Sequence, residues 1–193
     1  MASQSPLSIN AIQHLVSQIL HDLITHFTSF SLGVDHITSL QDPMWQTVHK
    51  AKNQMYEQIN LVRYLFMPGM GVGKDAQALL HSYVAGLNID IKGTIDQHPR
   101  MTCGLAWWLS KQIYGSKTGQ IVIQKNCLSI HADHVRQDVG NEDAILETGQ
   151  PSTNPREGVA WYVFHLASLA DQSLSVHRQD RQLSIHWKQK TIT

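Results

Sequence analysis

The chain has 193 residues, of which 42% are apolar and 16% charged, so it can bury a substantial core and is too apolar to be disordered. Its 15 basic and 15 acidic side chains cancel. A net charge near zero argues against nucleic acid or an anionic membrane surface as the main partner. No apolar run approaches the length of a membrane span, and the first residues lack a signal-peptide pattern, so we expect a cytoplasmic protein.

The first part of the chain carries two long amphipathic patterns. In residues 9–40, apolar side chains recur every three, four or seven positions, which predicts a helix close to a heptad repeat. A second helical stripe covers residues 44–66, and Pro43 and Pro68 mark turns at its two ends. Two such helices joined by a short turn predict an antiparallel hairpin. Its apolar stripes need further cover, and a symmetric four-helix homodimer supplies it.

The stretch Gly69–Asp75 invites comparison with a phosphate-binding loop. The Walker pattern requires a glycine five residues before Gly73, where this chain has Pro68. It also requires serine or threonine after Lys74, where this chain has an aspartate. We therefore interpret the stretch as a hinge between two parts of the chain.

The pattern after the hinge alternates between helical periodicity and strand-like alternation. Residues 133–154 carry no clear pattern. This order predicts an α+β fold in which helices cover one face of a mixed sheet. The predicted elements are a helix over 74–85, a strand over 87–92, a helix over 99–114, a hairpin of 120–124 and 127–132, a helix over 156–170, and a hairpin of 173–177 and 182–187.

Neither the cysteines nor the histidines form a recognised metal-binding pattern. Cys103 and Cys127 have no CxxC spacing, which predicts two reduced, packed thiols. The 12 histidines are scattered, and only His131 and His134 have a spacing that allows weak chelation. We therefore expect the chain to bind no metal ion.

One stretch of the first helix has the composition of a phosphoryl-accepting site. In a heptad with Leu23 and Phe30 at position a, His21 falls at position f, farthest from the seam, with Asp22 and Thr25 flanking it. An exposed imidazole keeps its ordinary basicity for attack on phosphorus, and an adjacent carboxylate can orient the ring or take its proton. A solvated polar helix face has the same composition, so the residues alone leave both interpretations open.

The run Ile19–Thr25 resembles the H-box of histidine kinases and, more closely, that of ChpT-type bacterial histidine phosphotransferases. The order of elements from about residue 10 to residue 187 is also similar, including the closing segment Pro155–Tyr162 and the hairpin Ser173–Trp187. The resemblance implies a dimerisation and phosphotransfer hairpin over 8–68, a hinge over 69–75, and a degenerate histidine-kinase ATPase-like domain of the Bergerat type over 76–189.

The family pattern implies that His21 accepts the phosphoryl group, with Asp22 and Thr25 as its neighbours. His26 stands where the family usually has proline, and it and His14 are rival imidazoles. A receiver domain brings its own Mg²⁺ and aspartate, so this chain needs only an imidazole and a docking surface. We expect that surface on the exposed helix around the histidine, at Ser17, Gln18, Ile24, Thr25 and Thr28.

The same resemblance implies that the second domain has lost its nucleotide. Histidine kinases hold Mg²⁺ with an asparagine on the helix that matches residues 101–108, and this stretch has none. Asp133 takes the acidic position of the kinase Asp-x-Gly-x-Gly turn, but Val135 and Gln137 stand where the glycines should be. A glycine-rich lid is also missing from the sequence. We therefore expect no cofactor of its own.

Together these inferences predict a histidine phosphotransferase that works as a homodimer. It would exchange a phosphoryl group with the receiver-domain aspartate of a hybrid kinase and with response regulators. Two alternatives stay open: a non-catalytic dimeric adaptor that docks a response regulator, and an ATP-dependent histidine kinase.

Overall fold

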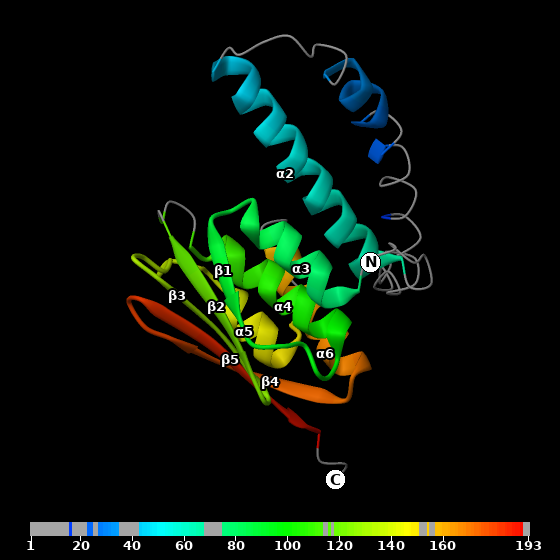
Figure 1. Cartoon of the computed structure of the whole chain (residues 1–193). Coiled ribbons are helices and arrows are strands. Elements are labelled where there is room, and N and C mark those ends of the chain that lie inside the picture. Colours follow the sequence, from blue (N-terminus) through cyan, green and yellow to red (C-terminus); the bar gives the residue numbers. More distant parts are fainter. Residues whose placement is uncertain are drawn as a thin grey trace, which may run out of the picture. The chain divides into compact units, whose positions relative to one another are not determined.

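The computed structural model divides the chain into two compact units, formed by residues 1–74 and 75–193. Figure 1 traces both units along the chain. No helix within the described ranges is long and apolar enough to cross a bilayer. The structure describes residues 16, 23–24, 27–34, 43–67, 75–113, 116, 118–150, 154 and 157–190.

The N-terminal unit is helical wherever it is described up to Phe66. Residues 27–34 form a helical segment, and residues 16 and 23–24 are helical as well. Helix α2 spans Pro43–Phe66, which confirms the second predicted helix. Proline suits the first turn of a helix because its missing N–H has no partner there in any case.

The C-terminal unit has the predicted order of elements with one addition. The addition is helix α5, which lies in the stretch where the sequence carries no clear pattern. The α+β fold class is confirmed. The elements are α3 (Ala76–Ala85), β1 (Ile89–Lys92), α4 (Pro99–Lys111), β2 (Gly119–Gln124), β3 (Cys127–Ala132), α5 (Glu142–Thr148), α6 (Gly158–Leu169), β4 (Gln172–Arg178) and β5 (Gln182–Gln189).

Local side chains set the ends of several helices. The carboxylate of Asp75 accepts a hydrogen bond from the Ala78 backbone N–H at 2.6 Å and so caps the N-terminus of α3. The last residue of the predicted hinge is therefore a helix cap. Pro99 opens α4, and Gly149 closes α5 with a φ of 73° in the left-handed region.

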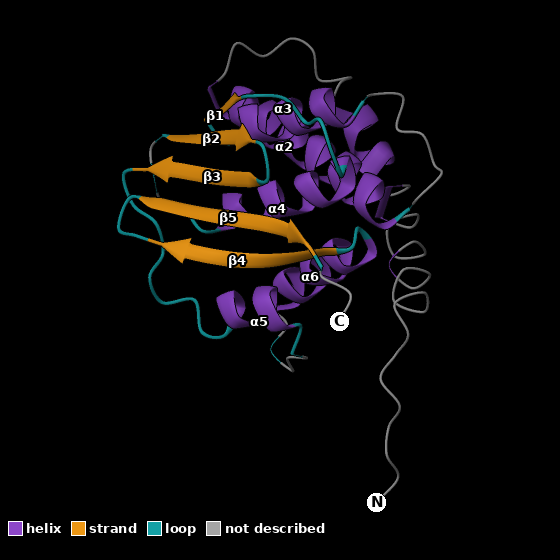
Figure 2. Cartoon of the chain, turned by 90° about the horizontal axis from the view of Figure 1, so that it is seen from below, coloured by secondary structure: helices purple, strands orange, loops and turns teal. Residues whose placement is uncertain are grey.

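The five strands form one mixed sheet in the order β1-β2-β3-β5-β4, with β1 parallel to β2 and all other pairs antiparallel. Side chains alternate between its two faces. Figure 2 shows helices α4, α5 and α6 packed on one face, as the sequence predicts. The aliphatic side chains that face these helices, among them Ile121, Leu128, Ile130, Leu183 and Ile185, are completely buried.

Strand β4 forms one edge of this sheet, and α5 packs beside it. The Val176 backbone N–H donates to Glu147 Oε1 of α5 at 2.8 Å. Two residues further along β4, Arg178 donates to the Asp143 carboxylate of the same helix. Helix α5 is therefore held to the edge strand by hydrogen bonds as well as by apolar contact.

Candidate functional site

The predicted phosphoryl-accepting site lies mostly outside the described residues. Of the docking residues, Ile24 and Thr28 are described: Ile24 is half-buried and Thr28 is exposed. The Thr28 hydroxyl donates to the Ile24 carbonyl at 2.8 Å, one helical turn before it. The roles of the remaining site residues stay predictions; these are His21, Asp22, Thr25, Ser17 and Gln18.

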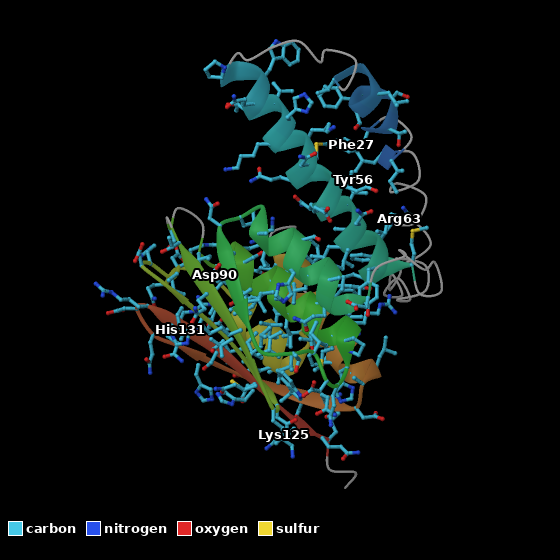
Figure 3. All side chains as sticks on the ribbon, in the orientation of Figure 1. Phe27, Tyr56, Arg63, Asp90, Lys125 and His131 are labelled. Atoms are coloured by element: carbon cyan, nitrogen blue, oxygen red, sulfur yellow. The ribbon has the colours of Figure 1, made fainter. Side chains whose placement is uncertain are left out.

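Burial on the helical segment shows which side of it contacts the rest of the chain. Phe27 and Val34 are buried, and the Phe27 ring stacks on Tyr56 of α2 at a centroid distance of 6.5 Å (Figure 3). These two buried residues occupy heptad position e, next to a on the helix surface. Thr28 shares position f with His21 and is exposed. The register thus leaves position f in solvent where it is described.

The same hairpin exposes large apolar side chains. Each of five such side chains exposes at least 43% of its surface. Two of them, Leu23 and Phe30, occupy the predicted seam position a. Exposed apolar side chains at one heptad position, as at Leu23 and Phe30, mark a surface that another helix can cover. The five residues are Leu23, Phe30, Leu32, Met55 and Tyr56.

Helix α4 contains residues 101–108, the stretch in which the sequence has no asparagine. Its residues from Met101 to Ala106 are all buried, and Trp108 is 1% exposed. Nine of the 13 residues of this helix are buried in the domain.

A buried carboxylate lies against the C-terminal half of α4. Glu142, the first residue of α5, is 5% exposed. Its Oε2 atom accepts hydrogen bonds from Trp108 Nε1 and Gln112 Nε2, each at 2.8 Å. Arg136 Nη1 lies 3.8 Å from Oε1 and supplies a nearby positive charge. The carboxylate therefore has the partners that burial of a charge requires.

Arg178 of β4 completes this network. Its guanidinium forms a bidentate pair with Asp143, with Nε–Oδ2 and Nη2–Oδ1 distances of 2.9 and 2.6 Å. It also donates to the Arg136 carbonyl and lies 5.9 Å from the centroid of the Trp108 ring. The planar fork matches a carboxylate in geometry as well as charge. We call Trp108, Gln112, Arg136, Glu142, Asp143 and Arg178 the interior network.

The interior network also fixes the loop that follows β3. Asp133, which follows β3 directly after Ala132, is exposed. The Arg136 backbone N–H donates to the Gln112 carbonyl at 2.8 Å, which ties the loop to the end of α4. Arg136 and Arg178 pair with the carboxylates of Glu142 and Asp143, so the four charges of this region balance one another.

The sequence held a signal for this network that periodicity alone does not reveal. Arg178 continues the inward alternation of Leu174 and Val176, so it falls at a core-facing position. A charge at such a position needs a buried partner. Asp143, in the unpatterned stretch, is the partner that the structure supplies.

Both cysteines are unpaired and buried, as predicted. Burial raises the pKa of the Cys103 thiol to about 12 and raises that of Cys127. Across the described ranges, no three histidine, cysteine or acidic side chains are placed to hold a metal ion.

Comparison with known proteins identifies the fold. No protein-family model and no curated protein matches the sequence. The structure is similar to that of a bacterial phosphotransferase, with a TM-score of 0.65 and 15% identity over 97% of this chain and 98% of the other. It also aligns with the histidine kinase domain of a blue-light-activated kinase from Erythrobacter litoralis EL346, with a TM-score of 0.41 and 11% identity over 84% and 94% of the two chains. The chain therefore shares its α+β fold with the bacterial phosphotransferase.

Proposed function

We propose that this protein is a cytoplasmic histidine phosphotransferase of a two-component phosphorelay. His21 accepts a phosphoryl group from the receiver-domain aspartate of a hybrid kinase and passes it to the aspartate of a response regulator. The observation that carries the proposal is the His21-Asp22 pair, with Thr25, in a stretch whose sequence pattern predicts an amphipathic helix, in a chain whose fold matches that of a bacterial phosphotransferase.

The described part of the helix supports an exposed acceptor. Thr28 lies seven residues after His21, so it occupies the same heptad position, and it is exposed. Phe27, one position away, is buried against Tyr56. An acceptor at position f faces away from the hairpin contact, where a receiver domain can reach it.

The exposed apolar side chains of the hairpin support a homodimer. Leu23 and Phe30 lie at the predicted seam position of the first helix, and Met55 lies on the predicted apolar stripe of α2; all three are exposed. A second hairpin related by a two-fold axis would cover these residues in a four-helix bundle.

The interior network supports phosphotransfer without a nucleotide. Arg136 and Arg178 pair with Glu142 and Asp143, so these two arginines are engaged within the chain beside the loop that resembles the kinase nucleotide turn. In-line transfer between a histidine and an aspartate needs positioning and Mg²⁺, and the receiver domain supplies the metal. The chain then contributes the imidazole, with Asp22 orienting it or taking its proton.

The test is acid-labile phosphate on the purified protein, mapped to its residue. One sample receives ATP and Mg²⁺, and the other receives a phosphorylated receiver domain from the same organism. We expect label only with the receiver, and only on His21. His21→Ala should abolish the transfer, whereas His14→Ala and His26→Ala should retain it. These two variants are matched controls, because each removes a neighbouring imidazole of the same chemistry.

Each other outcome selects a different function. Label on His21 with ATP alone would establish a histidine kinase. Binding of the receiver that leaves no label, and that His21→Gln does not change, would establish a docking adaptor. Undiminished transfer through the His21→Ala variant would show that another residue accepts the phosphoryl group.

A further inference from the structure

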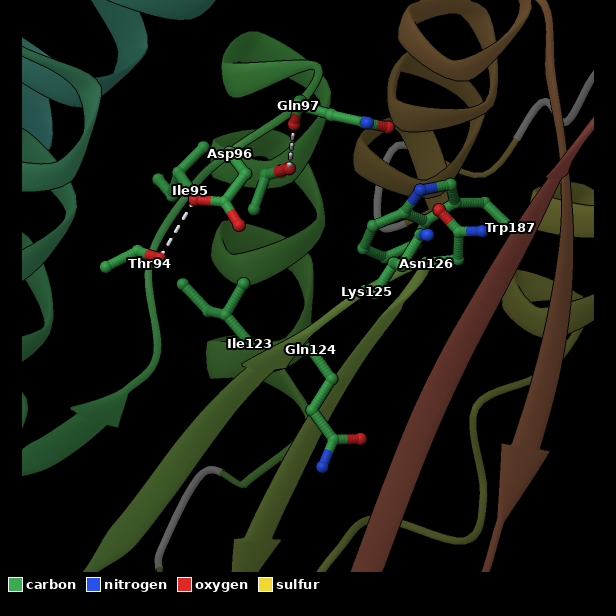
Figure 4. A pocket seen from close by; sticks show the side chains of 10 residues that line it. Thr94, Ile95, Asp96, Gln97, Ile123, Gln124, Lys125, Asn126 and Trp187 are labelled. Atoms are coloured by element: carbon green, nitrogen blue, oxygen red, sulfur yellow. Dashed lines mark hydrogen bonds between the residues drawn. The ribbon is translucent and has the colours of Figure 1, made fainter.

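A pocket of about 200 Å³ lies at the end of the sheet where the β2–β3 turn meets the loop between β1 and α4 (Figure 4). It is separate from the interior network and shares no residue with it. An apolar cavity of roughly 150 Å³ holds benzene, so this pocket admits a ligand of about six to ten non-hydrogen atoms. Its lining residues are Thr94–Gln97, Thr102, Ile123–Asn126 and Trp187.

Hydrogen bonds hold both walls of the pocket in place. On the loop side, Gln77 of α3 accepts from the Ile95 backbone N–H at 2.8 Å and donates to the Gly93 carbonyl at 3.4 Å. Gly93 has a φ of 95°, and a Cβ atom there would collide with the Ile123 carbonyl. On the turn side, the Trp187 backbone N–H donates to the Asn126 carbonyl at 3.0 Å. Holding the walls in this way lowers the cost of ordering them when a ligand binds.

The two walls carry opposite charges. Asp96 stands on the loop and Lys125 on the turn, and no ion pair joins them although both residues are described. The Asp96 Oδ1 atom accepts from the Thr94 hydroxyl at 2.9 Å, which sets the orientation of the carboxylate. The pocket therefore presents an anion and a cation across a space of ligand size.

Trp187 adds an apolar wall and an unused donor. The residue is 7% exposed, and its indole N–H has no hydrogen-bond partner in the part of the chain that is described. Buried polar groups in native proteins are nearly always hydrogen-bonded, so an unpaired one beside a pocket points to an acceptor that is absent. Ile123 supplies a second apolar surface.

We propose that this pocket binds a small zwitterion, an α-amino acid with an apolar side chain being the class that fits. The ligand's ammonium lies toward Asp96, its carboxylate toward Lys125 and the Trp187 indole, and its side chain against the indole face and Ile123. This ligand site is independent of the proposed phosphotransfer, because it uses none of the same residues.

The test follows the indole N–H resonance of Trp187 by ¹H–¹⁵N NMR in the full-length protein, assigned by its loss in Trp187→Phe. L-leucine is titrated beside two matched analogues: 4-methylpentanoate, which lacks the ammonium, and 3-methylbutylamine, which lacks the carboxylate. We expect a saturable shift with leucine, and affinities for the analogues weaker by about tenfold or more, since each loses one charge-assisted hydrogen bond.

Charge-neutral variants assign the two ends of the ligand. Asp96→Asn should weaken leucine binding but leave 4-methylpentanoate binding unchanged or stronger, and Lys125→Gln should weaken both. Asp90→Asn and Lys188→Gln, exposed charges outside the pocket, should change neither. Equal affinity for all three compounds would mean that the pocket recognises only the apolar part of the ligand, which would contradict the proposed roles of Asp96 and Lys125. The lack of a saturable shift with any of them would overturn the proposal.

Discussion

The two units of this protein treat their apolar and charged side chains in opposite ways. The hairpin unit leaves five large apolar side chains exposed, including Phe30 at 52%. The sheet unit covers nearly all of its own, with Leu87 and Leu169 the large apolar side chains exposed there among the described residues. It also buries charge in the interior network. The hairpin thus has the surface of an assembling element, whereas the sheet unit has a closed interior.

The largest expected effect is on the dissociation constant of the proposed dimer, when a charge is placed among the exposed apolar side chains of the hairpin. Phe30→Asp should weaken the proposed dimer by about 4 kcal/mol, roughly a thousandfold in Kd, because each of two protomers loses about 2 kcal/mol of apolar burial. Sedimentation equilibrium measures the Kd. Thr28→Asp adds the same charge to the exposed face of the same helix and should leave the Kd unchanged. An unchanged Kd for Phe30→Asp would place the interface elsewhere.

The next effect tests the closed interior. Arg178→Ala should lower the free energy of unfolding of the sheet unit by about 3 kcal/mol, because it leaves Asp143 without its bidentate partner. Urea unfolding followed by circular dichroism measures the change. Arg181→Ala removes an exposed arginine nearby and should cost less than about 0.5 kcal/mol. If the two variants unfold alike, the network contributes little to stability.

The smallest effect is a dependence of stability on alkaline pH. Burial raises the pKa of Cys103 to about 12, above the value near 9 of a free thiol. The stabilisation is therefore complete below pH 9 and is lost as the pH rises toward 12. From pH 8 to pH 10, the free energy of unfolding should fall by about 1.4 kcal/mol.

Cys103→Ala should remove most of this decrease in the free energy of unfolding. The comparison is between the pH dependences of the two proteins, measured by urea unfolding at each pH, and not between their stabilities at one pH. Tyr83, whose pKa burial also raises to about 12, starts from 10 and should contribute only about 0.4 kcal/mol by pH 10. Tyr83→Phe therefore serves as the control, and it should keep most of the decrease between pH 8 and pH 10. A slope that persists in Cys103→Ala would point to another buried group.

Periodicity was enough to predict most elements of the fold. The stripe of α2 and the alternation of β2 and β3 recur over enough residues to exceed chance, and the observed bounds agree within about two residues. Helix α5 was not predicted, because its seven residues are too few for a helical period to be recognised. Short helices of this kind depend on tertiary contacts, here those of Glu142, Asp143 and Glu147.

The candidate sites divide in the same way. The His21-Asp22 pair is local in sequence, so a motif can point to it. The interior network joins α4, the loop after β3, α5 and β4, and such contacts between distant segments have no local pattern. The zwitterion pocket likewise joins Asp96, Lys125 and Trp187 from three separate segments. Only the folded chain brings these residues together.

Helix α5 has a further consequence for the behaviour of the sheet in concentrated solution. An exposed edge strand offers unpaired N–H and C=O groups to a strand of another molecule. At β4, the Val176 N–H is already engaged by Glu147, so an incoming strand would first have to displace the helix. Helix α5 thus hinders edge-to-edge aggregation at β4. The opposite edge is strand β1, which has four residues and is protected mainly by being short.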